Sequence, residues 1–241
     1  MGVVMHQRKY ALELISKTGL SASKPEGIPI DINAKFTTKK YDEAISQKQQ
    51  QVVKDPVTDQ VAYQKLIGKL LYLTVIRPYI AFGVQTLSQF LQLPKNSHMD
   101  DALRIVKYLK KQHGQGVLLS SNSNRKVSAY CDADWAGCPI TRKSVTGFII
   151  KVGDSLISWK AKKQTTVSRG SAESEYRSLA TTVSELVWLT GILKDVDADF
   201  SLPIEVYSDS KATIQIAANP VYRERTKRIE IDCHFAREKL Q

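Results

Sequence analysis

The chain has 241 residues, enough for one large domain or two small ones, and its hydrophobic share of 42% excludes global disorder. Lys and Arg number 35 against 24 Asp and Glu, so the net charge of +11 favours a polyanionic partner. The 3 cysteines form no CxxC pair, which argues against a disulfide framework or structural zinc and favours a reducing compartment. No apolar run approaches the roughly 18 residues that span a bilayer, so we expect a soluble protein of the cytoplasm or nucleus without a membrane partner.

The N-terminal part predicts a short helix followed by a mobile linker. The pattern of residues 6–20 is typical of a helix that ends at Gly19. Residues 21–59 contain three prolines, the polar run SQKQQQ and no sustained periodicity, which favours a loop.

Residues 60–120 predict a small basic bundle of three helices. The first is VAYQKLIGKLLYLT, the second runs over residues 80–93 until Pro94 ends it, and the third begins at HMDDALRIVKYLKKQ. A paired aspartate after an apolar residue is also a polymerase signature, but that signature belongs on a hairpin between strands. Here Asp100 and Asp101 open a helix, so we interpret them as a helix cap.

After a polar break at residues 120–126 the pattern changes to strands. Alternation predicts strands over residues 127–133, 145–152 and 156–161, with a turn at Gly153-Asp154 between the last two. In the first strand it places Val127, Ala129 and Cys131 on one face and Tyr130 and Asp132 on the other. A long helix over residues 171–194, a fourth strand at 203–208, a short helix at 210–219 and a last helix at 230–240 follow. The long helix is expected to bury a stripe formed by Ala172, Tyr176, Leu179, Val183, Leu186, Val187 and Leu193. This order predicts an α/β (α+β) fold, a mixed sheet with helices against it.

Acidic residues at three places in the chain predict a carboxylate site for divalent metal. Asp132 lies near the end of the first of these strands, Glu173 and Glu175 lie in the first turns of the long helix, and Asp209 lies where the fourth strand ends. Metal-assisted phosphodiester hydrolysis needs such carboxylates to converge on one point. Singly, each has a simpler interpretation as a turn, helix-end or capping residue. Periodicity does not choose between Glu173 and Glu175.

Several longer motifs carry a resemblance to a known family. YCDADWAG, SVTGF, ISWKAKKQTTVSRGSAESEYRSLA, VYSDSKATIQIAANPV and RTKRIEIDCHFAREKL together resemble the ribonuclease H domain of copia-type retrotransposon polyproteins. Upstream, YQKLIGKLLYLTVIRP and the DDALRIVKYLK helix resemble the region that links that family's reverse transcriptase to its ribonuclease H, and the first 20 residues resemble the reverse transcriptase tail. The resemblance covers most of residues 60–241.

The resemblance implies a ribonuclease H-like fold with a five-stranded type of mixed sheet flanked by helices. It divides the chain into a reverse transcriptase tail and flexible linker (1–59), a helical connection region (60–120) and a ribonuclease H-like domain truncated at its C-terminus (126–241). It implies endonucleolytic hydrolysis of the RNA strand of RNA–DNA hybrids during reverse transcription, with two Mg²⁺ ions or Mn²⁺ as cofactor. The expected partners are the hybrid and the rest of a Pol polyprotein.

The resemblance also assigns individual residues. It gives Asp132, Glu175 and Asp209 the catalytic and metal-binding roles. Possible auxiliary residues are Asp134, Ser210, Asp232 and His234. The residues expected to hold nucleic acid are Arg142, Lys143, Lys160, Lys162, Lys163, Arg169, Arg223, Arg225, Lys227 and Arg228.

Departures from the family pattern leave enzymatic activity open. The family's polymerase aspartates lie upstream of Met1, its fourth ribonuclease H carboxylate falls beyond Gln241, and Tyr79 stands where the family tends to have aspartate. The alternatives are a catalytically inactive retroelement remnant that binds nucleic acid, a structural connector, and a resolvase or transposase on the same fold. Trp135 beside the site is expected either to pack in the core or to stack on a nucleotide, and Trp159 and Trp188 are expected in the core.

Overall fold

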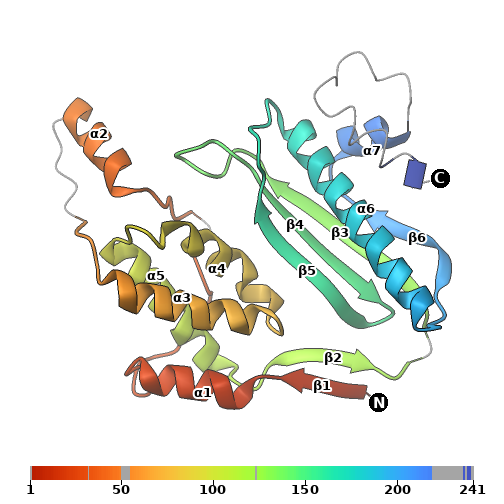
Figure 1. The fold of residues 1–241 in the computed structure, drawn as a ribbon, viewed down its shortest axis with the longest axis horizontal. Coiled ribbons are helices and arrows are strands. Elements are labelled where there is room, and N and C mark those ends of the chain that lie inside the picture. The colour runs from red at the N-terminus through yellow and green to blue at the C-terminus, as the bar shows by residue number, and fades with distance from the viewer. Residues whose placement is uncertain are drawn as a thin grey trace. The chain divides into compact units, whose positions relative to one another are not determined.

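A computed structural model describes residues 2–31, 33–49, 55–122 and 124–218, together with 236, 238 and 239 (Figure 1). The chain divides into two compact units. We call the first, formed mainly by residues 4–117, the helical unit. The second, formed mainly by residues 118–137 and 141–241, is the sheet unit.

Four α-helices build the core of the helical unit. They are α1 (Arg8–Lys17), α3 (Gln60–Thr74), α4 (Ala81–Leu87) and α5 (Asn96–Lys111). The side chain of Asp59 accepts hydrogen bonds from the backbone N–H groups of Val61 and Ala62 and so caps α3. The fully buried apolar residues of this core include Tyr63, Ile67, Leu70, Leu73, Val84, Leu87, Ile105 and Leu109.

Three details of this unit differ from the expectation. The predicted second helix is interrupted, because α4 lies between two 3₁₀ turns, Pro78–Ile80 and Ser88–Phe90. The interpretation of Asp100 and Asp101 as a cap was wrong, because α5 already begins at Asn96 and both aspartates lie inside it. The backbone N–H of Lys95 donates to Nδ1 of His98 at 3.1 Å, so a histidine side chain helps to begin this helix.

The predicted loop of residues 21–59 contains a helix, α2 (Lys39–Gln49). Its Asp42 carboxylate lies 2.6 Å from the buried ammonium group of Lys95, which also lies 3.3 Å from the carboxylate of Asp55. The partner that holds α2 therefore lies far away in sequence, which explains why local periodicity did not reveal it.

Two short strands were also not predicted. β1 (Gly2–His6) precedes α1, β2 (Gly116–Ser120) follows α5, and the two form a two-stranded sheet. Among the described residues no helix is long and apolar enough to cross a membrane. Cys131 is a buried free thiol.

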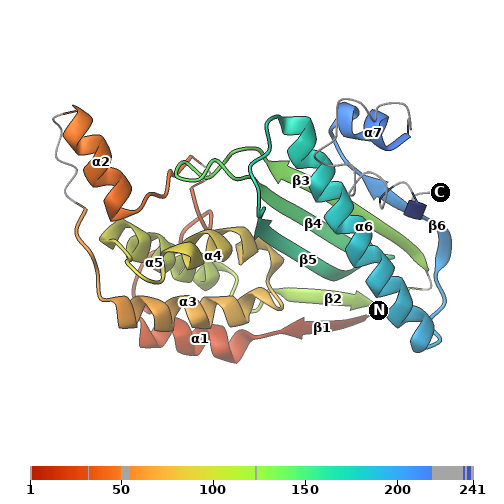
Figure 2. The ribbon, with the colours of Figure 1, turned by 45° about the horizontal axis from the view of Figure 1, so that its top comes forward.

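The sheet unit contains a mixed sheet with a long helix across one face (Figure 2). Its strands are β3 (Lys126–Asp134), β4 (Val145–Val152), β5 (Ser155–Lys163) and β6 (Ser201–Tyr207). The strand order is β5-β4-β3-β6, with β3 antiparallel to β4 and parallel to β6. The helices are α6 (Ser171–Asp195) and α7 (Lys211–Ala218). The predicted α/β fold with a mixed sheet is confirmed, and the described part of the sheet has 4 strands.

The core of the sheet unit lies between α6 and one face of the sheet. Val127, Ala129 and Cys131 are buried on alternate positions of β3, as predicted, and they pack with Tyr176 and Val183 of α6.

The predicted stripe along α6 fails near its end. Val187 is 42% exposed and Trp188 60% exposed, so the expectation that these residues are buried was wrong. Leu189 is buried instead. Leu186 and Leu189 are three residues apart, so they lie on the same face of the helix, whereas Val187 and Trp188 are turned away from it.

Candidate metal centre

Three carboxylates from separate parts of the sheet unit meet at one edge of the sheet. Asp132 lies near the end of β3, Glu175 in the second turn of α6, and Asp209 between β6 and α7. One carboxylate oxygen of each lies within 4.8 Å of one oxygen of the other two. β3 and β6 are parallel neighbours, so their carboxyl ends meet at the same edge, where open α/β sheets place functional sites.

The start of α6 is held against the sheet by hydrogen bonds beside the carboxylates. The hydroxyl of Ser178 donates to the backbone carbonyl of Asp132 at 2.7 Å and contacts the carbonyl of Gly147 at 3.3 Å. These contacts join the turn of α6 after Glu175 to both β3 and β4, and so fix the distance between Glu175 and Asp132.

The structure distinguishes the two candidate glutamates at the start of α6, Glu173 and Glu175. Glu173 accepts a hydrogen bond from the backbone N–H of Arg169 at 2.9 Å and pairs with the guanidinium of Arg177 at 2.9 Å. It therefore stabilises the beginning of the helix. Glu175 is only 8% exposed and lies in the carboxylate group.

The environment of Glu175 suits a cation. Burial raises the pKa of Glu175 to about 7, and the negative charges of Asp132 and Asp209 act in the same direction. Its Oε2 atom is buried and accepts no hydrogen bond within the described structure. A divalent ion would offset the repulsion between the three carboxylates, and an all-oxygen donor set is the kind that Mg²⁺ prefers. The residues present thus fit a magnesium or manganese ion.

The described auxiliary candidates lie next to the three carboxylates without joining the group. Burial, together with the charge of Asp132, raises the pKa of Asp134. A Cβ atom on Gly137 would lie 1.8 Å from Oδ2 of Asp134, so a larger residue there would displace the Asp134 carboxylate. The hydroxyl of Ser210 accepts a hydrogen bond from the backbone N–H of Thr213 at 3.3 Å and so helps to begin α7. Asp232 and His234 lie outside the described residues.

The predicted nucleic-acid-binding residues fall in different places. Arg142 and Lys143 lie in the segment before β4, and Arg169 lies in the loop before α6. Lys160, Lys162 and Lys163 belong to β5. Arg223, Arg225, Lys227 and Arg228 lie outside the described residues.

A buried glutamine, Gln164, helps to position the residues of the site, and no sequence pattern predicted this role. The side-chain N–H groups of Gln164 donate to the hydroxyl of Thr146 at 3.1 Å and to the backbone carbonyl of Ser174 at 3.0 Å. Its side-chain oxygen accepts from the hydroxyl of Ser168 at 3.1 Å. Gln164 thereby joins β4, the loop before α6 and the turn that carries Glu175. In the sequence it only follows two lysines, where it reads as a surface residue.

Trp135 does not pack in the core, which was one of its two expected roles. Its indole is 48% exposed, so it is not a core residue. Its Nε1–H donates to the backbone carbonyl of Ser168 at 3.3 Å, which fixes the ring over the loop before α6.

Comparisons with known proteins agree with the resemblance. The chain is 35% identical over 240 residues to the retrovirus-related Pol polyprotein from transposon RE1 of Arabidopsis thaliana, covering 100% of the chain and 16% of that protein. It is 30% identical to the corresponding polyprotein from transposon TNT 1-94 of Nicotiana tabacum, covering 97% of the chain and 17% of that protein. An uncharacterized mitochondrial protein of Arabidopsis thaliana is 36% identical over 78% of the chain and 72% of its own length.

No family model and no solved structure matches the chain. The chain spans about one sixth of the length of the Pol polyproteins that it matches, since it covers 16–17% of each. The similarity extends over nearly all of the chain, across both the helical unit and the sheet unit. The chain therefore belongs to the family of retrovirus-related Pol polyproteins from copia-type transposons.

Proposed function

We propose that the sheet unit is a metal-dependent ribonuclease H that hydrolyses the RNA strand of an RNA–DNA hybrid. The observation that carries the proposal is the convergence of Asp132, Glu175 and Asp209 at one edge of the sheet. The membership in a family of retroelement polyproteins supports the same substrate class, because reverse transcription produces such hybrids.

The three carboxylates have one shared task in this proposal. They would hold a divalent metal, whose chemistry there would be to polarise the phosphodiester and the attacking water. Ser178 and Gln164 keep the helix that carries Glu175 at a fixed position against β3 and β4. The raised pKa of Glu175 means that its proton is lost at near-neutral pH, and a cation lowers that pKa again by favouring the charged form.

The basic residues around the sheet would hold the substrate. Arg142 and Lys143 lie just before β4, and Arg169 lies just before α6. Their positively charged side chains suit phosphate oxygens. Such contacts position a hybrid without reading its bases.

Cleavage of a labelled RNA–DNA hybrid by the purified full chain tests the proposal. We expect cutting of the RNA strand that depends on Mg²⁺ or Mn²⁺. Asp132→Asn should reduce the rate by at least about a hundredfold, because even outer partners of a metal ligand contribute up to that factor. Glu173→Gln is the matched control, since Glu173 pairs with Arg177 outside the carboxylate group.

Two results would contradict the proposal. If Asp132→Asn cuts the RNA strand as fast as the unmodified chain does, the assignment of the catalytic carboxylates is wrong. Hybrid binding without any cleavage in either metal would favour the second candidate, a retroelement remnant that binds nucleic acid and has no catalytic activity.

A further inference from the structure

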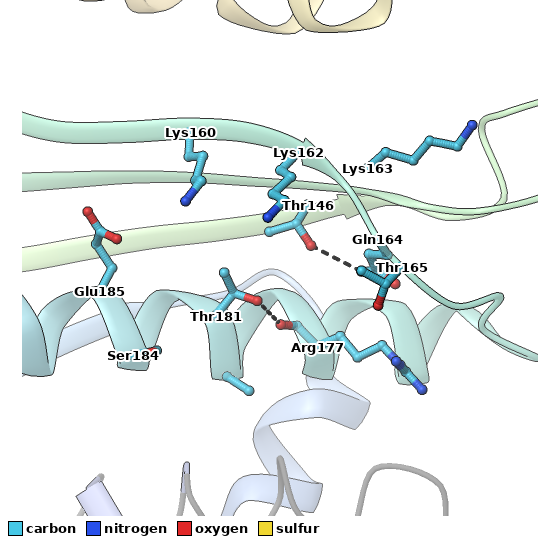
Figure 3. Close-up of a pocket in the computed structure, with 11 residues that line it drawn as sticks. Thr146, Lys160, Lys162, Lys163, Gln164, Thr165, Arg177, Thr181, Ser184 and Glu185 are labelled. Carbon is cyan, nitrogen blue, oxygen red and sulfur yellow. Dashed lines mark hydrogen bonds between the residues drawn. The ribbon is translucent and has the colours of Figure 1, made fainter. Parts of the chain in front are cut away.

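A groove of about 580 Å³ lies between β5 and α6 in the sheet unit (Figure 3). Lys160 and Lys162 of β5 form one wall, and their side chains extend toward α6 in Figure 3. The other wall carries polar side chains of α6. We call this the β5–α6 groove, and its main lining residues are Thr146, Lys160, Lys162, Arg177, Thr181 and Ser184.

The groove lies on the flank of α6 that faces away from the carboxylates. At 100° per residue, Arg177, Thr181 and Ser184 lie roughly 180–240° around the helix from Glu175. On the sheet, Lys162 pairs with Thr146 and Lys160 pairs with Phe148. Phe148 is buried against α6, so alternation places both lysines on the side of the sheet that α6 covers. The groove is thus separate from the candidate metal centre.

The two lysines provide positive charge that the described structure leaves unneutralised. None of the ion pairs between described residues includes Lys160 or Lys162. Arg177, by contrast, is held by Glu173 and by the hydroxyl of Thr166. Both lysines are exposed, so an anion can reach their ammonium groups.

One acidic residue closes an end of the groove. The carboxylate of Glu185 accepts a hydrogen bond from the hydroxyl of Ser158 at 2.9 Å. Ser158 lies on the same face of β5 as the lysines, two positions before Lys160. The anion-binding part of the groove therefore extends from Lys160 toward Lys162 and the loop before α6.

We propose that the β5–α6 groove binds consecutive phosphates of a single nucleic-acid strand. Lys160 and Lys162 are two residues apart on one face of a strand, which separates them by about 7 Å. Successive phosphates of a nucleic-acid strand have a comparable spacing, so each lysine can contact one of them. The groove is also large enough for a nucleotide unit.

The positive charge suits any polyanion, and the polar wall of the groove favours a nucleic-acid strand over an acidic peptide. The net charge of +11 draws polyanions to the whole chain. The hydroxyls of Thr181 and Ser184 opposite the lysines suit phosphate oxygens, and positive grooves with polar walls are how single strands are held without sequence preference. The groove would act as a second contact for a strand, apart from the carboxylates.

Binding of a fluorescent short oligothymidylate to the full chain, without divalent metal, tests this inference. We expect Lys160→Gln/Lys162→Gln to weaken binding about tenfold and to reduce the steepness of the salt dependence by roughly 1.4, about 0.7 for each lost phosphate contact. Lys151→Gln is the matched control, because Lys151 lies on the opposite face of the sheet. Ser184→Glu provides a second variant, which keeps both lysines and adds a negative charge to the helix wall.

The outcomes separate this inference from the proposed function. Because binding is measured without divalent metal, loss of cleavage in Asp132→Asn bears on the proposed function alone, and loss of oligonucleotide binding in the double lysine variant bears on this inference alone. Unchanged affinity in both the double lysine variant and Ser184→Glu, or an equal loss in Lys151→Gln, would overturn the inference. So would tighter lysine-dependent binding of inorganic triphosphate or of a polyglutamate peptide than of the oligonucleotide. Circular dichroism checks that each variant is folded.

Discussion

Glu175 connects the candidate metal centre to the stability of the sheet unit. Burial, with the charges of Asp132 and Asp209, raises its pKa from 4.5 to about 7. The folded protein therefore binds this proton more tightly than the unfolded chain does. The resulting stabilisation is fully present below about pH 4.5 and is lost as the pH rises through about 7.

We predict that Glu175→Gln removes this pH dependence. Without metal, the free energy of unfolding of the unmodified chain should fall by up to about 3 kcal/mol relative to the variant between these pH values. Denaturant unfolding of both proteins at a series of pH values measures the difference. Glu173→Gln serves as a control for loss of a carboxylate from the same helix turn. Parallel pH curves for the unmodified chain and Glu175→Gln would contradict the prediction.

Gln164 supports the position of Glu175 through three hydrogen bonds in a buried place. We predict that Gln164→Ala lowers the free energy of unfolding by about 3 kcal/mol, because the carbonyl of Ser174 and the hydroxyls around it lose their partner. Thr165→Ala, at the exposed next residue, should change it by less than about 0.5 kcal/mol. Equal unfolding midpoints for the two variants would show that the Gln164 contacts contribute nothing.

Part of the candidate site can be predicted from the residues of the sequence alone. Asp132 and Asp209 follow apolar strands, and strand ends are a recognisable place for ligands. Glu173 and Glu175 lie at similar angles from the apolar stripe, so periodicity leaves both open. Only the three-dimensional contacts separate them, since Arg169 and Arg177 hold Glu173.

At the scale of elements, α2 depends on a buried charge in a distant segment. Lys95 is 4% exposed and pairs with Asp42 of α2 and with Asp55. A buried ion pair that loses one partner leaves an uncompensated charge.

We therefore predict that Lys95→Gln destabilises the helical unit by about 3 kcal/mol and exposes α2 to faster amide hydrogen exchange. Lys39→Gln is the matched control, because its pair with Glu43 at 3.9 Å is exposed. Hydrogen exchange of residues 39–46, measured by mass spectrometry, reports the effect. Equal exchange in the two variants would mean that Lys95 does not hold α2.

Elements with a strong local pattern were predictable, and elements that depend on distant partners were not. The alternation of β3 gives its buried face directly, and α3 carries its own capping residue, Asp59. The strands β1 and β2 are far apart in sequence and stabilise each other only once paired. The end of α6 was predicted wrongly, because Val187 was assigned to the buried stripe and Trp188 to the core, whereas both side chains are exposed.

At the scale of the whole molecule, the chain has two separate hydrophobic cores, and its similarity to the Pol polyproteins runs continuously over both. The helical unit and the sheet unit each enclose a hydrophobic cluster of their own. The similarity to the Pol polyproteins of transposons RE1 and RE2 of Arabidopsis thaliana runs over 240 residues in each case and includes both units. Family membership thus applies to the chain as a whole, whereas the chemistry is argued from the carboxylates of the sheet unit.

The central claim is that Asp132, Glu175 and Asp209 together bind a divalent metal. Titration of the full chain with Mn²⁺, followed by electron paramagnetic resonance of the free ion, tests it without reference to any substrate. We predict saturable binding that Asp132→Asn and Asp209→Asn each weaken by at least about tenfold and that Glu173→Gln leaves unchanged. Mn²⁺ binding of equal strength in all four proteins would contradict the claim.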